Sequence, residues 1–91
     1  MLSGKIKSLL LKELDIEEID IIDESDKHQN HAQSNGGHFK LFIISKDFDG
    51  KTLIQRHRLV YDVLSSMIKK EIHALSINAF TKKEFDISNK N

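Results

Sequence analysis

The histidines of this sequence are the side chains best suited to bind a metal ion. Three of the five lie in one polar segment, "DESDKHQNHAQSNGGH" from Asp23 to His38, as His28, His31 and His38. Neutral imidazole is a good ligand for zinc, iron, copper and nickel. The spacing of His28 and His31 is a weak signal by itself, because histidines three residues apart occur by chance in polar loops. A solvated loop is the commoner explanation when the segment is taken alone.

Cysteine is absent from the chain. This excludes disulfides, thiolate metal ligands from this chain and a cysteine nucleophile, and it fits a reducing compartment. The serines and acidic residues are not in the sequence context of a nucleophile elbow or a catalytic triad. The phosphate-binding motifs GxxxxGK[ST] and GxGxxG are both absent. We therefore expect that the protein is not an enzyme. A partial metal site that another molecule completes fits these residues better than a closed zinc site with four ligands.

The length and charge balance of the chain limit its possible functions. A chain of 91 residues is one domain with a modest core. Lys plus Arg and Asp plus Glu each number 14, so no overall field attracts nucleic acid or an anionic membrane. The N-terminal segment "MLSGKIKSLLLKEL" has lysines among its apolar residues and no cleavage site. It predicts an amphipathic helix rather than a signal peptide or membrane span, and we expect a cytoplasmic protein.

Hydrophobic periodicity predicts the elements that must position the histidines. Apolar residues at helical spacing predict a first helix, and they are Leu2, Ile6, Leu9, Leu10 and Leu14. Ile19 and Ile21 alternate with acidic residues in a strand that ends near Asp23. After the polar segment, residues 38–45 are apolar at nearly every position, which predicts a strand covered on much of both faces.

A second helix and a third strand complete the predicted order. Thr52 and Gln55 have the spacing of a capping box, which predicts the start of the second helix. Its apolar stripe holds Val60, Val63, Leu64 and Met67, and Lys69 and Lys70 suit the negative end of the helix dipole. Residues 72–80 then predict a strand. We expect a single domain over residues 1–85 and a polar tail over residues 86–91.

The element order brings distant histidines to one end of the sheet. Helix–strand–strand–helix–strand is a small α+β fold with a three-stranded mixed sheet and helices on one face. The first two strands should be antiparallel, and the second and third, joined by a helix, should be parallel. Parallel strands start at the same end, so His28, His31, His38 and His73 are expected to share one rim. His57 lies inside the second helix and is not expected at this rim.

The sequence "RHR" is the obvious candidate for nucleic-acid contact. Arg56, His57 and Arg58 lie early in the second helix between apolar residues. Phosphate contact is one interpretation, while surface arginines on a core helix are the commoner one. His57 is expected to be buried and hydrogen-bonded.

Four segments together resemble the BolA family. They are "DESDKHQNHAQSNGGHFKLFIIS", the short "FDGK", "QRHRLVYDVL" and "IHALSINAFTKKEF", so the resemblance runs from about Ile19 to Phe85. The combination of "RHRLVY" and "IHALSI" at this separation is highly specific. The resemblance implies a class II KH-like fold, which agrees with the element order above.

The resemblance also implies a partner and a cofactor. Members form heterodimers with monothiol glutaredoxins of the CGFS type, in which a 2Fe–2S cluster is shared with the glutaredoxin cysteine and glutathione. The BolA protein supplies the histidine of the "IHALSI" strand, here His73, and a loop residue, here His28. His31 is the alternative to His28, and His38 has a structural or supporting role. We expect a function in iron–sulfur cluster trafficking or in iron and redox sensing, and a monomer or weak homodimer without the partner.

Some bacterial members are regarded as transcription regulators, which implies the alternative function of DNA binding. In that case Arg56, His57 and Arg58 would be the contacts. A KH domain grips nucleotides with a GxxG loop, and this sequence has no such loop between helices. The neutral net charge favours modest affinity that falls steeply with salt.

Overall fold

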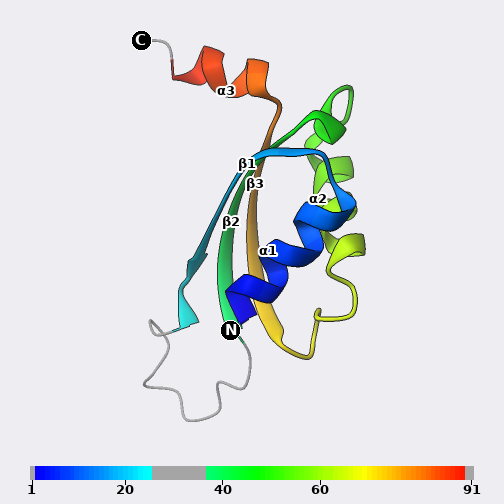
Figure 1. Cartoon of the computed structure of the whole chain (residues 1–91), viewed down its shortest axis with the longest axis vertical. Helices are drawn as coiled ribbons and strands as arrows, with labels where there is room; N and C mark the ends of the chain where they lie inside the picture. The colour runs from blue at the N-terminus through cyan, green and yellow to red at the C-terminus, as the bar shows by residue number, and fades with distance from the viewer. Residues whose placement is uncertain (1, 26–36, 90–91) are drawn as a thin grey trace.

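The computed structural model describes residues 2–25 and 37–89, which form three α-helices and one sheet (Figure 1). In chain order the elements are α1 (Leu2–Glu13), β1 (Ile16–Asp23), β2 (Gly37–Ser45), the 3-10 turn η2 (Lys46–Phe48), α2 (Leu53–Val63), β3 (Ile72–Phe80) and α3 (Lys82–Ser88). The predicted helix–strand–strand–helix–strand order is confirmed, and α3 follows it. None of the helices in these two ranges is long and apolar enough to span a membrane.

The sheet has the predicted mixed topology. Its strand order is β1–β2–β3, with β1 antiparallel to β2 and β2 parallel to β3. Ile19 pairs with Ile43 on one side of β2, and Ala79 pairs with Ile43 on the other. The central strand β2 is buried at most of its positions, as its continuous apolar sequence predicts.

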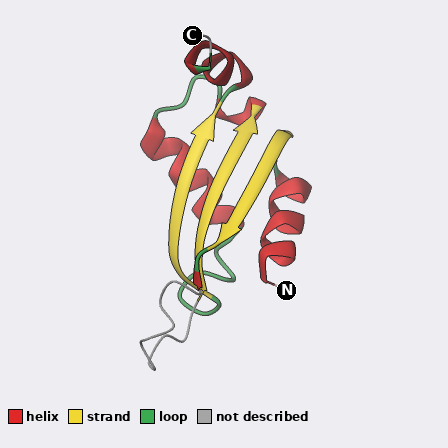
Figure 2. Ribbon diagram, turned by 90° about the vertical axis from the view of Figure 1, so that its left-hand side faces the viewer, coloured by secondary structure: helices red, strands yellow, loops and turns green. Residues whose placement is uncertain are grey.

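Helices α1 and α2 cover one face of the sheet and leave most of the other open (Figures 1 and 2). The core between these two layers is formed by apolar side chains from every layer, including Ile6, Leu10, Phe39, Leu41, Ile43, Phe48, Val60, Leu64, Met67 and Ile72. Side chains at alternate positions of a strand point to the same face, so β2 contributes Phe39, Leu41 and Ile43 together.

Helix α2 begins as predicted and ends earlier than predicted. The Thr52 hydroxyl accepts from the Gln55 amide, and the Gln55 side chain accepts from the Thr52 amide, which completes the capping box. The helix ends at Val63, and Lys69 has a positive φ of 69° in the turn before β3. Lys69 and Lys70 therefore do not lie at a helix end, so the dipole role expected of them is wrong.

Helix α3 forms where the sequence pattern predicts no helix. Thr81 and Glu84 form a second capping box, with the Thr81 hydroxyl accepting from the Glu84 amide at 3.2 Å. The ring of Phe85 packs against Phe42 of β2 and Phe80 of β3, at centroid distances of 5.3 and 6.2 Å. Phe42 lies on the strand face opposite Leu41 and Ile43. Helix α3 thus contacts one end of the face that α1 and α2 leave open.

The glycine before His38 is required by close packing. A β-carbon at Gly37 would overlap the ring of Phe39, and that ring is only 3% exposed, so it cannot move aside cheaply. Gly37→Ala should therefore lower the free energy of unfolding by about 1–3 kcal/mol, the usual cost of overpacking a core. Thermal or urea unfolding measures this.

The control is Gly4→Ala in α1, because a β-carbon there meets nothing within 4 Å. It should leave stability unchanged or raise it by roughly 0.5–1 kcal/mol, since alanine favours a helix over glycine. Equal effects of the two substitutions would contradict the assignment of Gly37 to a packing constraint.

Candidate functional site

His38 and His73 lie side by side at the rim where β2 and β3 begin. Their ring centroids are 5.4 Å apart, and the ring planes are tilted by 43°. His38 is the second residue of β2 and His73 is the second residue of β3. The two residues are 35 positions apart, and the parallel pairing of their strands brings them together. The predicted convergence is confirmed for this pair.

A β-bulge sets the position of His73. Gly37 pairs with Ile72, and the next residue of β2, His38, pairs with Ala74, so His73 is an extra residue in β3. An extra residue interrupts the regular alternation of a strand and redirects its side chain. His73 is exposed, and its ring lies beside that of His38. The bulge therefore presents an accessible imidazole at the rim.

Hydrogen bonds hold the end of β1 against the start of β2 at the same rim. The His38 amide donates to the Ser25 hydroxyl at 3.0 Å, and the Glu24 amide donates to the His38 carbonyl at 2.7 Å. Hydrogen bonds from Ser25, first from its side chain and then from its backbone amide, lower the pKa of the Asp23 carboxyl. The described chain stops at Ser25 and resumes at Gly37, and both of these residues lie at the histidine rim.

The start of β3 is fixed in a similar way. The Ile72 amide donates to the Met67 carbonyl at 2.9 Å, the Lys69 amide donates to the Ile72 carbonyl at 3.0 Å, and the Gly37 amide donates to the Glu71 carbonyl at 2.9 Å. A small cleft of about 180 Å³ lies on the strands beside this point and is lined by Glu24, His38, Phe39, Ala74, Leu75 and Ser76. The backbone is thus tied down on both sides of the histidine pair.

The two predicted loop ligands, His28 and His31, lie outside the described residues. Within residues 2–25 and 37–89, no group of three or more His, Cys, Asp or Glu side chains could hold a metal ion. His38 and His73 are the two imidazoles that the described part of the chain brings together. They offer nitrogen donors of the kind that suits iron.

The predicted nucleic-acid residues have three different environments. Arg58 is exposed and His57 is half-buried, whereas Arg56 is 6% exposed. The Arg56 guanidinium donates to both carboxylate oxygens of Glu84, at 2.7 and 2.8 Å. It also donates to the carbonyls of Lys51 and Ala79, and it lies 5.9 Å from the ring centroid of Phe48. The guanidinium of Arg56 therefore ties α2 to β3 and α3, while the structure leaves Arg58 open to solvent.

The paired geometry of Arg56 and Glu84 explains their pKa shifts. The hydrogen bonds from Arg56 lower the pKa of Glu84 to about 2, and the same hydrogen bonds raise the pKa of Arg56. Sequence reasoning missed this pair. The spacing of Thr81 and Glu84 was a capping-box signal that could have revealed α3, but no local pattern indicates that Glu84 also reaches Arg56, 28 residues earlier.

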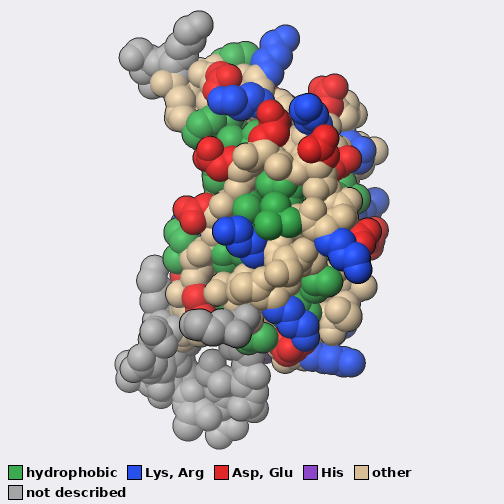
Figure 3. Space-filling model, in the orientation of Figure 1, with side chains coloured by type: hydrophobic (Ala, Val, Ile, Leu, Met, Phe, Trp, Pro, Cys, Tyr) green, Lys and Arg blue, Asp and Glu red, His purple; other side chains and the backbone are tan. Residues whose placement is uncertain are grey.

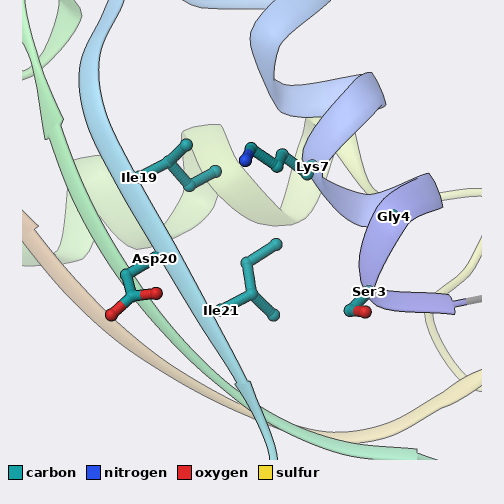
Figure 4. A pocket seen from close by; sticks show the side chains of 6 residues that line it. All are labelled: Ser3, Gly4, Lys7, Ile19, Asp20 and Ile21. Atoms are coloured by element: carbon teal, nitrogen blue, oxygen red, sulfur yellow. The ribbon is translucent and has the colours of Figure 1, made fainter.

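A second hollow lies between α1 and β1 (Figure 4), with a volume of about 200 Å³. Ile19 and Ile21 point from β1 toward α1, whereas Asp20 points to the other side of the strand. Lys7 and Ser3 are the polar side chains on its α1 side. Because its polar groups do not converge on one point, this hollow lacks the arrangement of a ligand site.

The comparisons with known proteins agree with this structure. The family model described as BolA-like protein matches residues 10–84. This chain therefore belongs to the BolA family.

Among its relatives is SufE-like protein 1, chloroplastic/mitochondrial, from Arabidopsis thaliana, which is 44% identical over 87 residues. That match covers 88% of this chain and only 24% of the relative. The solved BolA domain of SufE1 from the same plant superposes with a TM-score of 0.80 at 43% identity, and the match covers 89% of this chain and 92% of that domain. A Vibrio cholerae protein named DNA-binding transcriptional regulator BolA is 35% identical over 89 residues, which are 98% of this chain and 83% of that protein.

The pair of Arg56 and Glu84 generates a pH prediction. Because the pKa of Glu84 in the folded protein lies below its ordinary value of 4.5, its ionised form stabilises the fold above pH 4.5. This contribution is lost as the pH falls from about 4.5 toward about 2. Glu84→Gln should cost about 1–2 kcal/mol of unfolding free energy near neutral pH, a range reduced for the 45% exposure of the Glu84 side chain. Urea unfolding at several pH values measures both effects.

Asp86→Asn is the matched control. Asp86 pairs with Lys82 on the same helix at 2.8 Å, with both side chains more than half exposed. Such exposed pairs are screened by solvent and contribute little to stability. If Glu84→Gln and Asp86→Asn had the same small effect, the claim that Glu84 holds α3 in place would fail.

Proposed function

We propose that this BolA-family chain is the partner of a monothiol CGFS glutaredoxin and co-ligates a bridging 2Fe–2S cluster through histidines. In this role it takes part in iron–sulfur cluster trafficking or in iron and redox sensing, without catalysing a reaction, in the cytoplasm. The observation that carries the proposal is the pair of His38 and His73, with an exposed imidazole presented by a bulge at a rim. Membership of the BolA family supports it.

His73 is the first proposed ligand because its ring is exposed and its backbone is held on a hydrogen-bonded strand. His28 is the second, with His31 as the alternative. His28 is only three residues from Ser25 in the sequence, so the chain between the two is short. Ser25 is itself bonded to the backbone of His38. His31 is six residues from both Ser25 and Gly37 and can also approach the rim.

His38 has a supporting role in this proposal. Its amide is bonded to Ser25 and its carbonyl to Glu24, so its ring has a defined position next to His73. The ring limits the orientations open to the His73 imidazole. Groups that orient a histidine ligand in this way tune the affinity of a metal site.

The sulfur ligands must come from the partner side, because this chain has no cysteine. The cysteine of the glutaredoxin and the thiol of glutathione supply them. The bound cluster would carry one-electron redox chemistry or be passed to a recipient. Histidine in place of thiolate raises the potential of a cluster and makes ligation sensitive to protonation, which suits a labile or sensing site.

The central test is anaerobic reconstitution of the chain with a monothiol glutaredoxin, glutathione, iron and sulfide. The proposal predicts a coloured heterodimer. His73→Ala should alter the visible absorption and circular dichroism of that complex, because one iron ligand is replaced. His28→Ala should have a similar effect, whereas His31→Ala should have a smaller one.

His57→Ala is the control, since His57 lies on α2 away from the rim. Its complex should have the spectrum of the unsubstituted protein. An unchanged spectrum for His73→Ala would remove His73 from the ligand set. A heterodimer that forms equally well without a cluster would favour a simple protein–protein adaptor.

DNA binding is the second candidate function, because relatives of this chain are named DNA-binding transcriptional regulators. On the side of the molecule drawn in Figure 3, acidic and basic side chains are interspersed. Mixed charges of this kind do not form the broad basic surface that would attract the phosphates of DNA. Arg58 is the contact to test first, because Arg56 is bonded to Glu84.

A salt titration on duplex DNA distinguishes this second function. Arg58→Ala should weaken binding by a similar factor on all DNA sequences. It should also reduce the slope of the logarithm of the binding constant against the logarithm of the salt concentration by about 1 in magnitude, as expected for the loss of one phosphate contact. Absence of binding at low salt would exclude the regulator function.

A further inference from the structure

The two edges of the sheet differ sharply in charge. Strand β1 carries four acidic residues among its eight, namely Glu17, Glu18, Asp20 and Asp23. Strand β3, at the opposite edge, has the sequence "IHALSINAF" and contains no charged residue and no proline. Charged residues and prolines are the usual means by which proteins prevent an edge strand from pairing with another chain. The β1 edge is protected in this way, and the β3 edge is not.

The ends of the β3 edge are occupied by other parts of the described chain. At its start, the turn over residues 67–69 bonds to both the amide and the carbonyl of Ile72. Near its end, Arg56 donates to the Ala79 carbonyl. Between these points, residues 73–78 have no strand on their outer side within the described parts of the chain. The available edge is thus six residues long.

The contact of Arg56 also shows which backbone groups face outward. Ala79 lies within the ladder that pairs β3 with β2, so its carbonyl can meet Arg56 only on the outer side of β3. Backbone groups of alternate residues in a strand point to the same edge. The amides and carbonyls of Leu75 and Ile77 therefore also point outward.

We infer that this edge pairs with the same edge of a second copy of the chain, in an antiparallel arrangement centred on Ser76. An isologous dimer needs a self-complementary strand. With Ser76 opposite Ser76 of the second copy, Leu75 lies opposite Ile77 of that copy, and the outward groups of these two residues form hydrogen-bonded pairs. The two three-stranded sheets then join into one continuous sheet.

The side chains fit this register on both faces. On the helix-covered face, the half-buried Leu75 and Ile77 of each copy cover one another across the edge. On the open face, Ala74 lies opposite Asn78, and the two serines face each other, so only small side chains meet there. No charge of this strand is desolvated. The short edge buries little surface, which makes the dimer weak and dependent on concentration.

Ser76→Lys tests the inference, because it places two ammonium groups opposite each other at the symmetry axis while its side chain stays on the exposed face. Sedimentation equilibrium of the unsubstituted protein should show the mass rising with concentration from the 10.5 kDa of one chain toward twice that value. Ser76→Lys should weaken the association by about tenfold, since like charges directly opposite each other oppose strand pairing. Ser8→Lys on α1 adds the same charge elsewhere and should associate like the unsubstituted protein.

A second measurement uses the unsubstituted protein alone and does not depend on the folding of a variant. The amide protons of Leu75 and Ile77 should exchange more slowly as the protein concentration rises, while those at the outer edge of β1 should not change. A mass of one chain at all concentrations would overturn the inference. Equal association of Ser76→Lys and Ser8→Lys would also overturn it, and so would protection at the β1 edge instead of β3.

Discussion

The parallel pairing of β2 with β3 is the constraint on which the rest of this structure depends. Parallel strands start at one end of a sheet, and this rule alone brings His38 and His73 together from opposite sides of α2. The β-bulge at the start of the β2–β3 ladder also contributes, because it turns the exposed ring of His73 toward His38. Neither histidine is near the other in sequence, so the pair exists only while this ladder holds.

The two ends of β3 are secured by different means. At the rim, the turn after α2 and the amide of Gly37 fix the backbone around Ile72. At the far end, the buried guanidinium of Arg56 joins α2, β3 and α3 through its four hydrogen bonds. The first arginine of the Arg56–His57–Arg58 motif thus stabilises the fold, and its burial leaves Arg58 as the exposed arginine of that motif. Between its two secured ends, β3 presents an uncharged edge.

The parts of the structure that follow from local pattern were predictable from the sequence. The capping box at Thr52, the strand over residues 72–80 and the meeting of His38 with His73 came from spacing and from general rules of strand connection. The early end of α2 was not predictable in this way. Leu64 and Met67 continue its apolar stripe and are buried, yet the chain there has already left the helix to bond with Ile72.

Helix α3 was missed for a related reason. Its seven residues have no buried side chain and only a short apolar pattern, and its position depends on contacts of Glu84 and Phe85 with residues far away in the sequence. The choice between His28 and His31 falls outside the described residues and stays a prediction. The sequence pattern therefore predicted the histidine rim, whereas the position of α3 depends on contacts between residues far apart in the sequence.

The most direct measurement of the central claim is pulsed electron paramagnetic resonance of the reduced cluster complex, prepared with this chain labelled with ¹⁵N in its histidines and with unlabelled glutaredoxin and glutathione. If a histidine of this chain binds iron, the spectrum will contain a ¹⁵N hyperfine coupling of the size expected for a directly bound imidazole, and His73→Ala will change it. A complex that contains the cluster but lacks this coupling would contradict the account.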